Sequence, residues 1–138
     1  MDRKVYDTLL KWKSSSERAL VLEGPRQTGK TFIMKEFSKL YHDSVYINLE
    51  ENEELKTIFE QTNNASAIYE KLSYNGIRFD TSSGNPLFII DEIQSCPRAF
   101  SALKPLAIDG RCDILASGSL LGVELSEGDF LSPMGYVQ

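Results

Sequence analysis

Residues 19–41 read ALVLEGPRQTGKTFIMKEFSKLY, and the order of features in this segment predicts a strand, a glycine loop and a helix. The apolar run Ala19–Leu22 has the length of a short buried strand. It leads into a Gly-Pro pair, which interrupts regular structure. Apolar residues then recur at helical spacing between Lys30 and Tyr41, namely Ile33, Phe37 and Leu40.

The glycine loop matches the phosphate-binding pattern GxxxxGK[ST], the Walker A motif. Its residues are Gly24, Pro25, Arg26, Gln27, Thr28, Gly29, Lys30 and Thr31. Glycines let the backbone N–H groups converge on phosphate oxygens at the positive end of the following helix. Lys30 can then reach the β- and γ-phosphates, and the Thr31 hydroxyl can ligate Mg²⁺. We therefore expect residues 24–31 to hold a nucleotide and its metal ion.

A second motif decides which chemistry the loop serves. The segment Leu87–Ile90 reads LFII, which is typical of a strand covered on both faces, and Asp91 and Glu92 follow it directly. This is the Walker B pattern, in which Asp91 holds Mg²⁺ through water at the carboxyl edge of the sheet. Glu92 points elsewhere and can orient or deprotonate the attacking water. The alternative is a solvated turn after a buried strand, but with the phosphate loop upstream the acidic pair favours ATP hydrolysis.

Other nucleotide chemistries are open to a phosphate loop alone, including those of a small-molecule kinase and a GTPase. The chain has neither an NKxD-like guanine reader nor a DxxG switch, so GTP specificity is disfavoured. A phosphotransferase would need an acceptor pocket with its own polar or basic groups. We identify none in the sequence, although residues 50–85 have room for one.

Alternating strands and helices along the rest of the chain predict a parallel α/β sheet. Further strands are expected at Ser44–Leu49 and Asp113–Ala116. Helices are expected around Val5 to Trp12, in two short pieces between Leu55 and Leu72, and at Arg98–Ile108. The fold class is therefore a P-loop NTPase with three α/β/α layers.

Ser117 and Ser119 follow the strand at 113–116. In this class of ATPase that strand lies between the phosphate-loop strand and the Walker B strand. Either hydroxyl can therefore reach the γ-phosphate or the attacking water, the role called sensor 1. The alternative for each serine is a Gly-Ser turn that caps the next segment.

Composition describes one ordinary globular domain over residues 1–138, with 41% hydrophobic and 25% charged residues and a net charge of −5. Residues 1–43 hold nine Lys and Arg against six Asp and Glu, whereas residues 44–138 hold six against 14. No basic cluster stands out, so we do not expect direct nucleic-acid binding. Residues 1–13 lack the apolar run of a signal peptide or membrane span, so no membrane partner is expected.

The remaining candidate side chains are assigned no chemistry. Cys96 and Cys112 lie far apart with no CxxC spacing, which suggests a reducing, cytoplasmic setting without disulfide or zinc. We interpret Arg26 and Arg98 as solvated or salt-bridged rather than as phosphate clamps or arginine fingers. His42, the sole histidine, is expected at a helix end or on the surface.

Four segments together carry a resemblance to a known family: LEGPRQTGKT at 22–31, YINLEEN at 46–52, DEIQ at 91–94 with Pro97 after it, and ASGSLLG at 116–122. The sequence resembles prokaryotic AAA-type P-loop ATPases, usually longer proteins with a C-terminal domain related to restriction-endonuclease-like folds. The resemblance implies the additional-strand type of P-loop sheet and ATP with Mg²⁺ as ligand. It also implies functional roles for Lys30, Thr31, Asp91 and Glu92.

The sequence departs from that family near its end. Residues 132–136 read SPMGY where the family usually carries a Phe-Pro-Val-Gly-Lys-like segment. We therefore expect a fragment of a longer protein, truncated after the fourth strand, without the fifth strand, helical lid and C-terminal domain. The strand at 19–22 would then lie at a sheet edge and favour pairing with another copy.

The partners expected from this picture are ATP or ADP, the protein's own C-terminal domain and, through the sheet edge, a second copy. AAA-type sites commonly take an arginine from a lid or a neighbouring subunit. Nucleotide binding is therefore the first expectation and hydrolysis the second, with nucleotide state moving an attached domain or partner. A nucleotide-dependent switch with negligible turnover is the main alternative.

Overall fold

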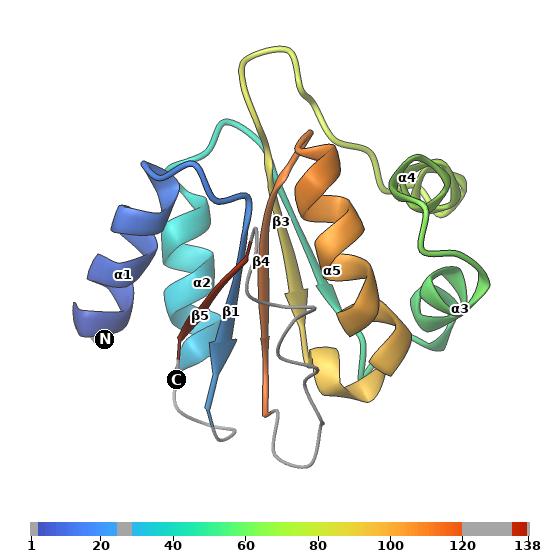
Figure 1. The fold of residues 1–138 in the computed structure, drawn as a ribbon, viewed down its shortest axis with the longest axis horizontal. Helices are drawn as coiled ribbons and strands as arrows, with labels where there is room; N and C mark the ends of the chain where they lie inside the picture. The colour runs from blue at the N-terminus through green and yellow to red at the C-terminus, as the bar shows by residue number, and fades with distance from the viewer. Residues whose placement is uncertain (1–2, 25–28, 120–133, 138) are drawn as a thin grey trace.

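The structure is a computed structural model that describes residues 3–24, 29–119 and the backbone of 134–137. Its strands are β1 (Ala19–Glu23), β2 (Ser44–Asn48), β3 (Leu87–Asp91), β4 (Asp113–Gly118) and β5 (Met134–Val137). They form one sheet in the order β2-β3-β4-β1-β5, and every pairing is parallel (Figure 1). The predicted α/β class and the place of β4 between β1 and β3 are confirmed.

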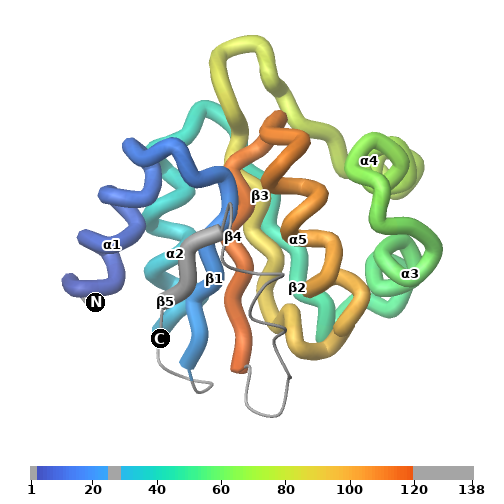
Figure 2. The backbone as a smooth tube through the Cα atoms, in the orientation of Figure 1, coloured from blue at the N-terminus to red at the C-terminus, as the bar shows by residue number. Residues whose placement is uncertain are grey.

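Helices cover both faces of the sheet, which gives the three predicted layers. The helices α1 (Arg3–Lys13) and α2 (Lys30–Ser38) lie on one face. The other face carries α3 (Glu53–Gln61), α4 (Ala65–Tyr74) and α5 (Pro97–Asp109), as the tube in Figure 2 also shows. A short 3₁₀ turn, η1 (Ile93–Ser95), links β3 to α5.

The expected absence of a fifth strand is wrong, because β5 pairs in parallel with β1 from Ala19 opposite Met134 to Leu22 opposite Val137. The strand is short and has Gly135 in its interior, which weakens strand propensity, so the sequence around it does not read as a strand. Pairing of its backbone with β1 stabilises this strand despite its low β-propensity. β1 is therefore an interior strand, and the basis for dimerisation through its edge is gone.

The core has two parts, one on each face of the sheet. Strand side chains alternate between them because successive residues of a strand point to opposite faces. Toward α1 and α2 point Leu20, Leu22, Leu87, Ile89 and Leu115. Toward α3, α4 and α5 point Ala19, Val21, Phe88, Ile90, Ile114 and Ala116. The continuous apolar run of β3 follows from this double covering.

The ends of the covering helices are fixed by polar residues in the turns. Asn52 and Asn64 cap α3 and α4, each accepting a hydrogen bond from a backbone N–H three residues on.

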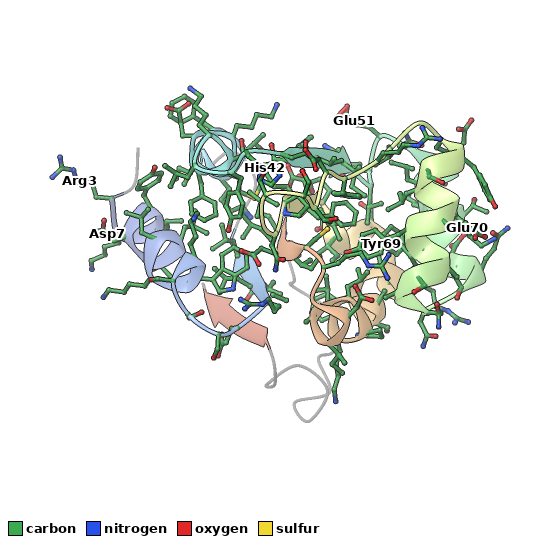
Figure 3. The ribbon with its side chains drawn as sticks, turned by 90° about the horizontal axis from the view of Figure 1, so that it is seen from above. Arg3, Asp7, His42, Glu51, Tyr69 and Glu70 are labelled. Carbon is green, nitrogen blue, oxygen red and sulfur yellow. The ribbon has the colours of Figure 1, made fainter. Side chains whose placement is uncertain are left out.

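In Figure 3, Arg3 and Asp7 mark α1 at one side of the molecule, and Tyr69 and Glu70 mark α4 at the other. Tyr69 is buried against Phe79 and Phe88, so α4 is anchored to the sheet by an aromatic cluster.

Candidate nucleotide site

The carboxyl ends of the parallel strands meet at one edge of the sheet, where the arrowheads in Figure 1 point. The register places Leu22 opposite Ser117 and Glu23 opposite Gly118, with Asn48 opposite Asp91 in the neighbouring pair. This edge is where ligands bind in open α/β sheets. The predicted site residues described by the structure gather here.

Gly29 shapes the start of α2. Its φ is 80°, in the left-handed region, and its carbonyl accepts a hydrogen bond from Ile33 N–H at 3.0 Å. Residues with a Cβ adopt this conformation at a cost, so glycine is required by the backbone rather than by crowding. The turn lets α2 begin directly at Lys30, with its positive N-terminal end at the sheet edge.

Lys30 lies between the ends of β1 and β4. Its Nζ donates to the carbonyl oxygens of Gly24 at 2.8 Å and Gly118 at 3.3 Å. Burial lowers the pKa of Lys30, while the charges of Asp91, Glu92 and Glu23 oppose that shift. A cation that is partly desolvated and, among the described residues, held by neutral carbonyls is well suited to exchange them for phosphate oxygens.

Asp91 lies at the end of β3 and is 4% exposed. Its Oδ2 accepts hydrogen bonds from Thr31 Oγ1 at 2.9 Å and from the Tyr46 hydroxyl at 2.5 Å. Its Oδ1 accepts from the Glu92 backbone N–H at 2.8 Å. Burial, and then the hydrogen bond to Asp91, raise the pKa of Tyr46, so this hydroxyl stays a donor.

The predicted Mg²⁺ ligands Thr31 and Asp91 are thus in direct contact. Both present oxygen, the ligand atom that Mg²⁺ prefers, and Mg²⁺ typically takes one or two protein ligands beside waters and substrate phosphates. The pair fits a metal ion that arrives with a nucleotide. Among the residues that the structure describes, no group of three or more His, Cys, Asp or Glu could hold a metal ion.

Glu92 departs from Asp91 in backbone and in direction. Its φ of 55° is the one positive value at a non-glycine residue within the described part of the chain. Strained backbone of this kind clusters at functional sites. The turn sends the half-buried Glu92 side chain to Gln94, whose Nε2 donates to Glu92 Oε1 at 2.8 Å. The two adjacent carboxylates therefore serve different partners.

The two serines differ in their surroundings. Ser117 is fully buried, and its Oγ has no hydrogen-bond partner among the described residues. Ser119 follows β4 and is half-buried. The structure thus brings Ser117 to the predicted edge beside β1.

Other predicted residues lie elsewhere. Within the loop, Pro25, Arg26, Gln27 and Thr28 lie outside the described residues. Arg98 is exposed on α5, and His42 contacts the Asp80 backbone carbonyl at 2.8 Å at the opposite end of the sheet. Cys96 and Cys112 are both buried as free thiols.

Sequence reasoning missed Tyr46 and Gln94 as site residues. Both stand in the segments that carry the family resemblance, but neither belongs to the Walker patterns. Their roles depend on which strands are neighbours: Tyr46 reaches Asp91 because β2 pairs with β3, and Gln94 reaches the end of β4 because β4 pairs with β3. A search for hydroxyl or amide groups near the ends of β2 and β3 would have found them.

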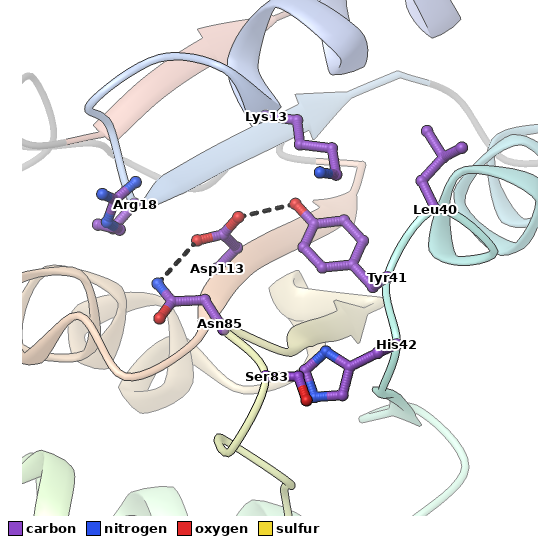
Figure 4. Close-up of a pocket in the computed structure, with 9 residues that line it drawn as sticks. Lys13, Arg18, Leu40, Tyr41, His42, Ser83, Asn85 and Asp113 are labelled. Atoms are coloured by element: carbon purple, nitrogen blue, oxygen red, sulfur yellow. Dashed lines mark hydrogen bonds between the residues drawn. The ribbon is translucent and has the colours of Figure 1, made fainter.

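A cavity of about 530 Å³ opens at the amino ends of the strands (Figure 4). Its lining includes Lys13, Arg18, Tyr41, Asn85 and Asp113. Asp113 accepts hydrogen bonds from the Tyr41 hydroxyl at 2.7 Å and from Asn85 Nδ2 at 3.2 Å. This cavity lies at the end of the sheet opposite to the phosphate loop and shares no residue with the nucleotide site.

The family described as an AAA domain matches residues 16–133. The chain belongs to the AAA domain family. Membership of this family supports nucleotide binding by the domain. No curated protein matches the chain.

Among solved structures, PCH-2 of C. elegans has a similar fold, with a TM-score of 0.57 at 19% identity. The match covers 97% of this chain and 41% of that one, so the chain spans less than half of the PCH-2 structure. At this identity the likeness concerns the AAA fold alone. Within the described residues of this AAA domain, no helix is both long and apolar enough to span a membrane.

Proposed function

We propose that this AAA domain binds ATP with Mg²⁺ and hydrolyses it to ADP and phosphate. The observation that carries the proposal is the contact between the Thr31 hydroxyl and the Asp91 carboxylate at 2.9 Å. It joins the phosphate loop to the acidic strand end, next to the half-buried Lys30. A phosphate loop that was only a structural turn would have no need of this contact.

Each loop and helix group has a role in binding. Residues Gly24, Pro25, Arg26, Gln27, Thr28 and Gly29 supply the backbone cradle for the phosphates. Lys30 gives up the carbonyls of Gly24 and Gly118 for the β- and γ-phosphate oxygens. Thr31 ligates Mg²⁺ directly and Asp91 holds it through water. When bound, the metal ion neutralises charge on the β- and γ-phosphates.

Hydrolysis requires a water in line with the bond between the γ-phosphorus and the bridging oxygen. Glu92 takes a proton from that water as its oxygen attacks the γ-phosphorus, and the bridging oxygen leaves with ADP. Ser117 and Ser119 stand at the end of β4, where a hydroxyl can contact the γ-phosphate or the water. The buried Ser117 Oγ, without a partner in the described part of the chain, supports this role.

Nucleotide state then moves an attached domain or a partner. The C-terminal restriction-endonuclease-like domain expected from the family resemblance is the first such partner, and a neighbouring copy of the protein is the second. Either can supply the arginine that stabilises charge on the γ-phosphate in the transition state. We place the protein in the cytoplasm.

A nucleotide-dependent switch with slow turnover is the second candidate. A switch of this kind would bind ATP with the same residues and differ only in its rate of hydrolysis.

Calorimetric titration with Mg²⁺-ATP tests the binding step. We expect Lys30→Ala to lose measurable binding, whereas Lys39→Ala, an exposed lysine at the end of the same helix, keeps the affinity of the parent protein. Phosphate release on the same samples then separates the two candidates. Glu92→Gln should hydrolyse ATP more slowly while ATP affinity is kept; a parent protein that binds ATP without releasing phosphate would be a switch. Binding by Lys30→Ala at parent affinity would refute the proposal.

A further inference from the structure

We infer that Gln94 is a positioning residue that fixes the Glu92 carboxylate relative to Lys30. The inference rests on the proposed function, since it concerns how the water-activating group is held. Its basis is the placement of one amide side chain between Glu92 on one side and Gly118 at the end of β4 on the other.

The first contact is the hydrogen bond from Gln94 Nε2 to Glu92 Oε1, at 2.8 Å. A donor to a carboxylate forms a stronger bond than one between neutral groups. The backbone between the two residues is also fixed, because Ser95 N–H donates to the Glu92 carbonyl at 3.0 Å and Glu92 holds its left-handed conformation. Orientation of this carboxylate is therefore defined at both its backbone and one of its oxygens.

The second contact is steric. A Cβ at Gly118 would lie 2.1 Å from Gln94 Oε1 and 3.1 Å from the Ile93 backbone nitrogen. The φ of Gly118 is not in the left-handed region, so what limits a side chain here is space: with a Cβ at position 118, the Gln94 amide would have to move. Gln94 is thus packed against the backbone of β4, which holds its amide in place.

Gly118 connects this contact to the phosphate loop. Its carbonyl oxygen accepts hydrogen bonds from the Gly24 backbone N–H and from Lys30 Nζ, both at 3.3 Å. One residue at the end of β4 therefore touches Gln94 through its Cα side and Lys30 through its carbonyl. Gln94, which holds the Glu92 carboxylate, and Lys30 therefore both contact Gly118.

Packing alone does not explain an amide at this position. Gln94 Oε1 is buried and has no hydrogen-bond partner among the described residues, which is unfavourable for folding. A methionine of similar length would fill the space without burying an unpaired acceptor. The group at this position with an evident use is the Nε2 donor, and it is directed at Glu92.

The test is Gln94→Met, which keeps the length of the side chain and removes the donor. We expect the kcat of ATP hydrolysis to fall by about tenfold or more while KM for ATP changes by less than about twofold. The melting temperature should stay equal or rise, since an unpaired buried acceptor is removed. Gln61→Met makes the same chemical change at the exposed end of α3 and should leave all three quantities unchanged.

A double-substitution cycle distinguishes positioning from a general structural effect. In a Glu92→Gln background, Gln94→Met should cost less than about a further twofold in kcat, because it acts through the carboxylate that has been removed. If the fold-reductions in kcat of the two single substitutions multiply in the double variant, Gln94 acts independently of Glu92 and the inference is overturned. A parent rate in Gln94→Met, with Glu92→Gln slowed as expected, would overturn the inference and leave the proposed function intact.

A readout without turnover keeps the inference testable if hydrolysis itself fails. The side-chain amide protons of Gln94 should resonate away from those of the exposed Gln61 in an ¹H–¹⁵N NMR spectrum and should move in Glu92→Ala. If the chemical shifts of the Gln94 amide protons do not change in Glu92→Ala, the inference is overturned. If they respond but the parent protein releases no phosphate, the contact stands and the proposed hydrolysis is what fails.

Discussion

Two buried aspartates lie at opposite ends of the same sheet and share one local arrangement. Asp91 ends β3 and Asp113 begins β4, with exposures of 4% and 7%. Each accepts a hydrogen bond from a tyrosine hydroxyl that comes from the β2 side of the molecule, Tyr46 at 2.5 Å and Tyr41 at 2.7 Å. A burial percentage and a tyrosine partner therefore do not tell the two acids apart.

The remaining partners do tell them apart. Asp91 also binds Thr31 on the first turn of α2, and Lys30 lies near enough for its charge to be felt. Asp113 instead accepts from the Asn85 amide. Its Tyr41 partner is covered by the Lys13 ammonium at 4.9 Å from the ring centroid. In a parallel sheet the helix N-termini follow the carboxyl ends of strands, so a buried aspartate at that edge, such as Asp91, is proposed to act in ligand binding, and one at the amino edge, such as Asp113, as a structural clamp.

The largest expected effect comes from removing each acid. Asp91→Ala should lower the rate of ATP hydrolysis by about 100-fold or more, because it removes the water-mediated metal ligand. Asp113→Ala should lower the free energy of unfolding by about 2–4 kcal/mol, because the Tyr41 hydroxyl and the Asn85 amide lose a charged acceptor. Phosphate release and urea denaturation, measured on both variants, check this.

The contrast between the two edges requires both results, the loss of hydrolysis in Asp91→Ala and the loss of stability in Asp113→Ala. Activity per folded molecule in Asp113→Ala should stay near the parent value. If Asp113→Ala unfolds no more easily than the parent protein, Asp113 is not a clamp and the comparison fails at the amino edge. If it abolishes turnover while folded, the two edges are coupled.

The features that could be predicted from the sequence are those that depend on residues close together in the chain. The Walker patterns are local in the chain. The strand, tight turn and helix that hold Gly29, Lys30 and Thr31, and the strand that ends at Asp91, were predicted from spacing because such segments leave few geometries. The run Leu87–Ile90 was likewise readable, since only a strand covered on both faces is apolar throughout.

The features that could not be read depend on strand order. The contacts of Tyr46 with Asp91 and of Gln94 with Gly118 require β2, β3 and β4 to be neighbours, which no single segment encodes. Strand β5 was missed because four residues with an interior glycine carry a weak pattern, and its pairing with β1 is decided by the sheet. Local elements were predictable from the sequence, whereas the contacts of Tyr46 and Gln94 across the sheet were not.

Alkaline pH provides a weaker way to compare the two tyrosines. Burial, and then the neighbouring aspartate, raise the pKa of both Tyr41 and Tyr46 above the ordinary value of about 10. The unfolded chain therefore loses these protons first, so their contribution to stability is complete below about pH 10 and declines as pH rises beyond it. Each tyrosine should contribute up to about 1.4 kcal/mol of lost stability per pH unit above that value.

Tyr41→Phe and Tyr46→Phe, each compared with the parent protein by urea denaturation between pH 9 and 11, measure these two slopes. The difference between variant and parent removes the contribution of other buried groups, such as Tyr69, whose pKa burial also raises. We expect both variants to lose stability less steeply than the parent. Equal slopes in parent and variant would mean that the tyrosine is not held protonated by its aspartate.

The smallest effect is expected from an exposed acid at the amino edge, which serves as the reference for the buried pair. Asp109 accepts two hydrogen bonds from the Arg111 guanidinium, at 2.7 and 2.9 Å, but the Arg111 side chain is 38% exposed. Donation from Arg111 lowers the pKa of Asp109. Its contribution is therefore complete above about pH 4 and is lost as pH falls through the lowered value. Because solvent screens the pair, Asp109→Asn should cost less than about 1 kcal/mol at neutral pH and nothing in strong acid. Urea denaturation at pH 6 and pH 2 measures both values, and a cost as large as that of Asp113→Ala would mean that burial is not what makes Asp113 a clamp.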